Sequence, residues 1–251
     1  MRIIIAENYE KMSQKAAGFI ASQMILQPTS ILGLATGSTP IGTYQKLIEL
    51  NHEGVIDFSK IKTFNLDEYL GISPENTQSY YHFMQENLFN HINIKSNQTH
   101  VPNGQAQSIE AECLSYEKAI QDAGGIDLQL LGIGSNGHIG FNEPSEHFEA
   151  ITHKVKLTQE TIEANSRFFE KIDDVPTEAV SMGTRTIMRA RKVLLVASGA
   201  SKSQAVLDAL CGPITPQSPA SILQLHPDVT FILDVEAASL LDHTLGNDFS
   251  I

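Results

Sequence analysis

The chain has 251 residues, 41% of them hydrophobic and 18% charged, which fits a globular protein with one substantial core. Its 17 Lys and Arg against 29 Asp and Glu give a net charge of −12. This charge argues against nonspecific nucleic-acid binding, although local cations and helix N-termini can still hold a small anionic substrate. No apolar run approaches the roughly 20 residues of a membrane span, and two distant cysteines, Cys113 and Cys211, predict a reduced, cytoplasmic protein.

Short apolar runs alternate with helical patterns along the chain. The expected strands are residues 2–6, 31–35, 62–66, 128–133, 193–197 and 230–233. The expected helices are residues 8–24, 39–50, 79–89, 108–122, 158–168 and 202–210. The alternation predicts parallel strands joined by crossover helices, and continuously apolar strands predict a sheet covered on both faces. We therefore expect one α/β domain over residues 1–251.

Ligands of open α/β sheets bind beyond the carboxyl ends of the strands, so the loops that follow the expected strands are candidate site segments. The first is Thr36-Gly37-Ser38-Thr39, which brings a glycine and three hydroxyls to the start of a helix. Free N–H groups there attract phosphate, whereas the alternative is an ordinary Ser/Thr N-cap. No lysine follows the glycine as in a P-loop, which argues against a nucleoside triphosphate.

A second loop with the same pattern follows the strand at residues 193–197. It places Lys202 at a helix start, against the preference of the helix dipole, and a bound anion would explain this. Arg167 is another candidate cation, with a surface salt bridge as the alternative.

Two adjacent carboxylates, Asp67 and Glu68, follow the strand at residues 62–66. In a cleft at the sheet end, one of them could be desolvated, with a raised pKa, and act as a general base. The alternative is that Asp67 caps a short turn and Glu68 points to solvent.

The richest segment is Gly132-Ile133-Gly134-Ser135-Asn136-Gly137-His138-Ile139-Gly140-Phe141-Asn142-Glu143-Pro144. His138 and Glu143 suit a general base oriented by a carboxylate. The segment has neither the GxSxG nor the complete dinucleotide-binding pattern. The nine histidines show no HxH or HExxH pairing, so we expect no metal.

Five segments, in order and over nearly the whole chain, together resemble the glucosamine-6-phosphate deaminase family. They are Thr36-Gly37-Ser38-Thr39-Pro40, Phe64-Asn65-Leu66-Asp67-Glu68-Tyr69, Gly134-Ser135-Asn136-Gly137-His138-Ile139-Gly140-Phe141-Asn142-Glu143-Pro144, Ala164-Asn165-Ser166-Arg167-Phe168-Phe169 and Gly199-Ala200-Ser201-Lys202. Each motif alone is weak, but the ordered combination is specific.

The resemblance implies a Rossmann-like, doubly wound α/β fold with a mainly parallel sheet and helices on both faces. It implies conversion of D-glucosamine 6-phosphate and water to D-fructose 6-phosphate and ammonia in amino-sugar catabolism, with no metal or organic cofactor. It makes Asp67 the base at C2 and gives ring opening to His138, Glu143 and Asn136. The implied phosphate-binding residues are Thr36, Gly37, Ser38, Thr39, Arg167 and Lys202, and the implied sugar-binding residues are Gly134, Ser135 and Gly137.

Two departures from the family pattern carry expectations of their own. Some members have Asp where this chain has Asn136; because Asn cannot accept a proton, it could only orient His138 and would leave Glu143 as the main carboxylate partner. Allosteric members carry a basic pair where His153 and Val155 stand here, so we expect the short, non-allosteric type.

Two other functions remain open from the sequence. A 6-phosphogluconolactonase shares the fold and a glycine-histidine loop but would not need the Asp67 base. A sugar-phosphate-sensing regulator would need a DNA-binding module, for which the acidic charge is unfavourable. We expect a monomer or small homo-oligomer whose ligand is a sugar phosphate, without nucleic-acid or membrane partners.

Overall fold

The structure is a computed structural model that describes residues 1–166, 171 and 175–241. Its strands are β1 (Arg2–Ala6), β2 (Ile31–Leu34), β3 (Lys62–Asn65), β4 (Asp67–Tyr69), β5 (Thr99–His100), β6 (Leu128–Leu131), β7 (His153–Lys156), β8 (Glu178–Ser181), β9 (Lys192–Ala197) and β10 (Val229–Asp234). Its α-helices are α1 (Tyr9–Leu26), α2 (Ile41–His52), α3 (Tyr80–Asn87), α4 (Ile109–Ala123), α5 (Gln159–Ser166), α6 (Thr184–Met188) and α7 (Ser203–Cys211).

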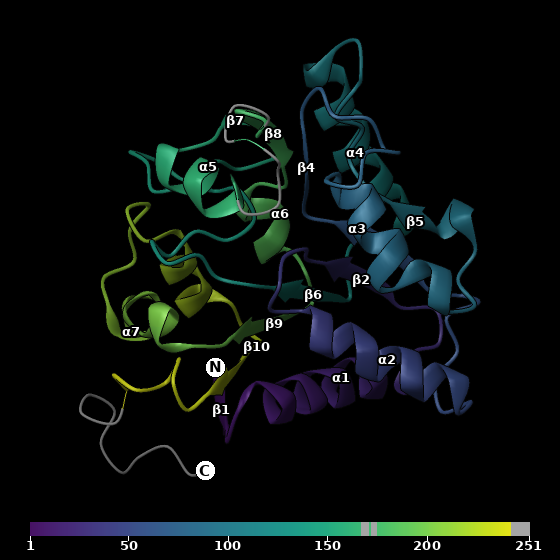
Figure 1. The fold of residues 1–251 in the computed structure, drawn as a ribbon, viewed down its shortest axis with the longest axis horizontal. Coiled ribbons are helices and arrows are strands. Elements are labelled where there is room, and N and C mark those ends of the chain that lie inside the picture. Colours follow the sequence, from purple (N-terminus) through teal and green to yellow (C-terminus); the bar gives the residue numbers. More distant parts are fainter. Residues whose placement is uncertain (167–170, 172–174, 242–251) are drawn as a thin grey trace.

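A seven-stranded sheet forms the centre of the fold, in the order β1-β10-β9-β6-β2-β3-β5, and all of its strand pairs are parallel. Helices α1 and α2 lie along one side of the sheet, and α4 and α6 lie on the other (Figure 1). The predicted doubly wound, mainly parallel α/β fold is confirmed. Of the part of the chain that is described, no helix is both long and apolar enough to cross a membrane.

The sequence explains the elements locally. Strands β2, β6 and β10 are buried along their whole length, as their largely apolar sequences predict. Helices α1, α3 and α4 begin after Asn8, Ser79 and Ser108, whose side chains accept hydrogen bonds from backbone N–H groups of the first turn. The predicted helix at 158–168 begins as α5, but its last two residues lie outside the described residues.

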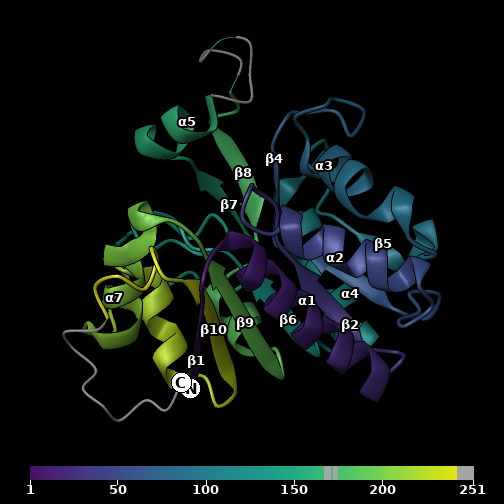
Figure 2. The same cartoon turned by 60° about the horizontal axis from the view of Figure 1, so that its bottom comes forward.

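A second, smaller sheet was not predicted from the sequence. It has the order β4-β8-β7 with antiparallel pairing, and it lies at the end of the large sheet where β4 follows β3 (Figure 2). Asp67 therefore does not lie in a loop: it is the first residue of β4 and pairs with Ser181 of β8. A further hydrogen bond, from the N–H of Met182 to the carbonyl of Leu66, fixes the entry into β4.

The strand order locates the expected ligand site. In the large sheet, the strand that follows β2 along the chain is β3, which lies on one side of β2, whereas the next strand of this sheet after β6 is β9, which lies on the opposite side. Since β2 and β6 are neighbours, the loops after their carboxyl ends diverge and leave a crevice between them. The glycine-rich segments after β2 and β6 are these two loops.

Candidate active site

A cavity of about 480 Å³ opens at this switch point, within the size range of small-molecule sites. The loops after β2, β3, β6 and β9 all contribute to it, as the sheet-end rule predicts. The predicted site residues that line it are Thr36, Gly37, Ser38, Thr39, Asp67, Gly134, Ser135, His138 and Lys202. Asn136 and Glu143 lie behind His138, outside the cavity lining, and Arg167 lies outside the described residues.

The hydroxyl groups of the loop after β2 do not cap helix α2. Helix α2 begins after Pro40, and no side chain caps it. Ser38 instead contributes its backbone carbonyl to this turn, accepting from the N–H of Ile41 at 3.4 Å. The N-cap alternative is therefore wrong, and Ser38 and Thr39 both line the cavity.

The loop after β9 is anchored from below by a buried carboxylate. Asp234, at the end of β10, accepts hydrogen bonds from the Ser198 hydroxyl at 2.5 Å and from the N–H of Gly199 at 3.1 Å. The short 3-10 helix Ala200–Lys202 follows and leads into α7. This arrangement fixes the backbone that carries Lys202 to the cavity.

Asp67 is a buried carboxylate on the cavity wall, 5% exposed. Burial, with the nearby charge of Glu68 as a second cause, raises its pKa to about 8. Among the described residues no hydrogen bond to its carboxylate oxygens is formed, so nothing stabilises the ionised form. Asp67 can therefore exchange a proton near neutral pH, as a general base requires.

The alternative in which Glu68 points to solvent is wrong, because this residue is buried, with only 3% of its surface exposed. Its carboxylate accepts hydrogen bonds from the backbone N–H groups of Tyr69, Tyr80 and Tyr81, at 2.8 to 2.9 Å. Burial raises its pKa, and these three hydrogen bonds only partly offset the rise. Glu68 thus ties the start of α3 to β4, while its neighbour Asp67 faces the cavity.

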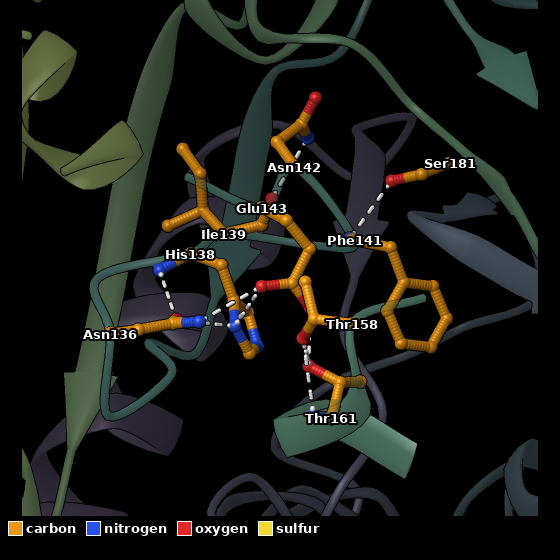
Figure 3. Close-up of polar contacts among 9 residues, drawn as sticks. All are labelled: Asn136, His138, Ile139, Phe141, Asn142, Glu143, Thr158, Thr161 and Ser181. Atoms are coloured by element: carbon orange, nitrogen blue, oxygen red, sulfur yellow. Dashed lines mark hydrogen bonds and ion pairs between the residues drawn. The ribbon is translucent and has the colours of Figure 1, made fainter. Parts of the chain in front are cut away.

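Figure 3 shows a polar relay behind the cavity that joins His138, Asn136 and Glu143. Asn136 Oδ1 lies 2.7 Å from His138 Nδ1, and Asn136 Nδ2 donates to Glu143 Oε2 at 2.9 Å. Glu143 Oε2 is itself 3.4 Å from His138 Nδ1. Asn136 is thus the nearer partner of the imidazole, as expected of an amide that can only orient His138, and Glu143 is the carboxylate partner, linked to the ring largely through Asn136.

The relay determines the state of the imidazole. A carboxamide oxygen only accepts, so His138 Nδ1 carries a proton and, in the neutral ring, Nε2 is the acceptor. Burial alone would raise the pKa of Glu143, but the hydrogen bond and charge of His138, with hydrogen bonds from Thr161 and Asn136, lower it overall. Glu143 is therefore an anion that supports a proton-accepting imidazole.

Glycines in this segment make room for functional side chains. A Cβ on Gly134 would lie 2.3 Å from ring atoms of His138. A Cβ on Gly140, whose φ is +59°, would lie 3.0 Å from Ser181 Oγ and 3.5 Å from Asp67 Oδ2. Gly137, expected to contact sugar, instead lies outside the cavity lining, and its carbonyl accepts from the N–H of Ala220 at 2.9 Å.

Three contributing residues were missed from the sequence. Tyr80 lines the cavity, and its hydroxyl donates to that of Tyr69 at 3.3 Å and is hydrogen-bonded to the Thr36 side chain. Ser181 Oγ accepts from the N–H of Phe141 at 3.0 Å, which links β8 to residues 132–144, the histidine loop. Thr161 of α5 donates to Glu143 Oε1. No sequence signal marks these residues, because their roles depend on contacts between distant segments.

The described residues contain no group of three or more His, Cys, Asp or Glu side chains arranged to hold a metal ion. The two cysteines are free: Cys113 is buried and Cys211 is exposed.

Comparison with known proteins identifies a single family of relatives. A family model described as glucosamine-6-phosphate isomerases/6-phosphogluconolactonase matches residues 6–231. Among curated proteins, a glucosamine-6-phosphate deaminase of Clostridium botulinum (strain Loch Maree) is 59% identical over 96% of this chain and 99% of its own length. One of Halothermothrix orenii is 58% identical over 96% of this chain and 100% of its own.

Solved structures agree with the sequence comparison. A monomeric glucosamine-6-phosphate deaminase superposes with a TM-score of 0.93 at 47% identity, over 96% of this chain and 100% of that one. A 6-phosphogluconolactonase from Thermotoga maritima shares the fold, with a TM-score of 0.74 at 20% identity over 93% of this chain and 99% of that one. The chain therefore belongs to the glucosamine-6-phosphate isomerase/6-phosphogluconolactonase family.

Proposed function

We propose that the chain converts D-glucosamine 6-phosphate and water to D-fructose 6-phosphate and ammonia. The observation that carries this proposal is the buried carboxylate of Asp67, with its pKa of about 8, on the wall of a cavity that His138 and Lys202 also line. The names and high identity of the two curated relatives support the same reaction.

The phosphate of the substrate binds between the loops after β2 and β9. Ser38 and Thr39 offer hydroxyl donors and backbone N–H groups, and Lys202 offers a positive charge. We assign Arg167 to the same phosphate from the family resemblance. Binding energy from this remote group positions C1 and C2 of the sugar for reaction, and the anion is held although the whole chain is acidic.

Ring opening is the task of His138. Its Nε2 takes the proton of the hydroxyl on C1, and the same proton returns to the ring oxygen as the C1–O5 bond breaks. Asn136 holds the Nδ1–H tautomer, and the negative charge of Glu143 stabilises the imidazolium formed in between.

Asp67 then moves a proton from C2 to C1 of the open sugar. Removal of the C2 proton from the ammonium-bearing aldehyde, with transfer of a proton from the ammonium nitrogen to O1, gives an enolamine, and return of the first proton at C1 gives a protonated imine at C2. Water adds to this imine, which releases ammonia and leaves the ketone of fructose 6-phosphate. The ammonium group of the bound substrate favours the ionised form of Asp67, and so offsets the burial that raises its pKa.

The lactonase alternative shares this fold, but its reaction, hydrolysis of a cyclic ester, has no step in which a proton leaves C2. A buried carboxylate with a raised pKa is explained by the deaminase reaction and not by the lactonase reaction. The sensing alternative does not require such a base either.

The test is to incubate the purified protein with glucosamine 6-phosphate and, separately, with 6-phosphogluconolactone. We expect ammonia and fructose 6-phosphate in equal amounts from the first and no hydrolysis above background from the second. Lactone hydrolysis without ammonia release would refute the proposal, and saturable binding of glucosamine 6-phosphate with no turnover would favour the sensor.

We further propose that the protein acts as a monomer in the cytoplasm. The solved deaminase at 47% identity is described as monomeric, which supports this state. The two free cysteines fit a reducing compartment.

A further inference from the structure

Helix α5 makes a direct hydrogen bond to the relay behind the active site. The hydroxyl of Thr161 donates to Glu143 Oε1, and both side chains are buried, at 5% and 9% exposure (Figure 3). Thr161 also lines the cavity, at the point where α5 meets the histidine loop.

The two oxygens of Glu143 have separate partners. Oε2 faces the relay, accepting from Asn136 Nδ2 at 2.9 Å and lying 3.4 Å from His138 Nδ1. Oε1 faces α5 and accepts from Thr161. The bond to Thr161 therefore fixes the rotation of the carboxylate about its last torsion, which would otherwise be broad.

The direction of this bond is set by the helix start. Thr158, which precedes α5, donates its hydroxyl hydrogen to Thr161 Oγ1 at 3.1 Å. The hydroxyl of Thr161 then donates its own hydrogen to Glu143. The capping contact itself uses the backbone N–H of Thr161, which donates to Thr158 Oγ1 at 3.3 Å, so the Thr161 side chain is not needed for the cap.

We propose that Thr161 is a positioning residue for ring opening: it holds the Glu143 carboxylate so that Oε2 supports Asn136 and His138. This inference rests on the proposed function. It assigns to Thr161 a part in the reaction that neither the sequence motifs nor the family resemblance gives it.

Other ionisable groups line a second cavity of about 300 Å³, to which Glu143 itself also contributes together with residues of the loop after β6 and of β7. They are His147, Glu149, His153, Lys154 and Lys156. His147 and Glu149 pair with each other at 3.0 Å, and Lys154 pairs with Glu178 at 2.8 Å. Of the ionisable side chains in the described residues, His138 is the one that lies within ion-pair distance of Glu143.

The test compares Thr161→Val with Thr161→Ser. Valine keeps the shape and the backbone cap but removes the hydroxyl, so the buried Oε1 loses its donor. We expect kcat to fall about ten-fold in Thr161→Val, with KM within about two-fold of wild type. Serine keeps the hydroxyl, and Thr161→Ser should recover most of the activity.

Thr186→Val is a matched control. Thr186 is also 5% exposed and donates its hydroxyl to a glutamate, Glu117 Oε1, at 2.7 Å, away from the cavity lining. It should lose thermal stability as Thr161→Val does, but keep the wild-type kcat and pH profile.

A measurement without substrate separates this inference from the proposed function. The ¹³C shift of the Glu143 carboxyl carbon, assigned with Glu143→Gln, is followed against pH in each variant. Because the Thr161 hydrogen bond helps to lower the pKa of Glu143, its titration should move to higher pH in Thr161→Val alone. An unchanged titration in Thr161→Val, or a Thr161→Ser variant as impaired as Thr161→Val, would overturn the inference. Absence of ammonia release by wild type would overturn the proposed function, and the titration would still decide the role of Thr161.

Discussion

Adjacent carboxylates can have different roles when their surroundings differ. Asp67 and Glu68 are both buried, but Glu68 accepts three backbone hydrogen bonds, whereas no described residue donates to Asp67. The alternation of side chains along β4 sends one carboxylate to the cavity and the other to the start of α3. The charge of Glu68 then helps to raise the pKa of Asp67.

This coupling predicts a pH dependence. A base works only when it is ionised, so kcat/KM should rise with pH through the pKa of free Asp67, about 8. Glu68→Gln removes the neighbouring charge and should move this rise to lower pH. Ionisation of the substrate amine contributes equally to both profiles, so the difference between variant and wild type isolates the enzyme group. Coincident profiles would show that Glu68 does not act on Asp67.

Burial of Asp67 also predicts a cost in stability. Its pKa of about 8 in the folded state exceeds the ~3.9 of an unfolded chain, so between these pH values the folded state binds the extra proton. The free energy of unfolding therefore falls as pH rises from about 4 to 8, by at most about 1.4 kcal/mol per pH unit from this group.

Because Asp67→Asn has no carboxylate to ionise, its free energy of unfolding does not fall with pH in this way, and the variant should be more stable than wild type. The difference should grow from pH 5 to pH 8 and then level off, as thermal unfolding in a pH series would show. A difference that is constant over this range would mean that Asp67 is ionised throughout.

The elements that build the site are short connections whose backbones are fixed from outside the cavity. Asp234 holds the loop after β9, and pairing with β8 holds β4. Phe141 and Asn142 tie the histidine loop to the end of β8, through Ser181 Oγ and the carbonyl of Met182. Preorganised loops of this kind supply the orientation that the reaction needs.

Phosphate binding at these loops predicts the behaviour of Lys202→Ala. One charge-assisted contact contributes about 1.5–3 kcal/mol, so KM should rise about ten- to a hundred-fold, with a smaller fall in kcat. We expect the same of Arg167→Ala. Lys118→Ala, which removes an exposed lysine paired with Asp122 on α4, is the matched control and should change neither constant. Unchanged KM in both site variants would mean that the phosphate binds elsewhere.

The sequence predicted the strands that have a continuous or nearly continuous hydrophobic pattern. The six apolar strands and the loops at their carboxyl ends follow from local composition. The small sheet could not be predicted, because β4 is three residues long and carries two carboxylates, and β7 alternates lysines with half-buried residues. Both are strands because they pair with β8.

The candidate site, like the strands, could be predicted only where the sequence carries a local signal. Asp67, His138 and Lys202 stand at strand ends, where chemistry is expected, and the structure brings them to one cavity. Thr161 and Tyr80 could not be found, since a threonine and a tyrosine near helix starts carry no signal of their own. Their contacts arise only when α3 and α5 pack beside the loops after β2 and β6.

At the scale of the whole molecule, the two sheets share one cavity. The large sheet supplies the loops that we propose to bind phosphate, and the small sheet supplies Asp67. We therefore propose that residues 1–251 act as a single domain, in which neither sheet has a complete site.

The residues of β7 also bear on whether the protein has an allosteric effector site. At the positions where the family resemblance puts the basic pair of allosteric members, β7 has His153 and Val155, which are half-buried, while Lys154 and Lys156 beside them are exposed. Lys154 is already paired with Glu178. We expect hyperbolic kinetics in glucosamine 6-phosphate and no activation by N-acetylglucosamine 6-phosphate. Sigmoidal initial rates that the acetylated sugar phosphate makes hyperbolic would reveal an effector site.

The central claim is that Asp67 moves the proton from C2 to C1 in a deaminase that needs no cofactor. The most direct measurement is ammonia release from glucosamine 6-phosphate by wild type and Asp67→Asn, both treated with EDTA and desalted, with substrate binding followed by calorimetry. We expect wild type to stay active and Asp67→Asn to bind normally while kcat falls at least ~10²-fold. A variant that binds and turns over near the wild-type rate would contradict the claim, and so would a wild-type enzyme that regains activity only when a divalent metal is restored.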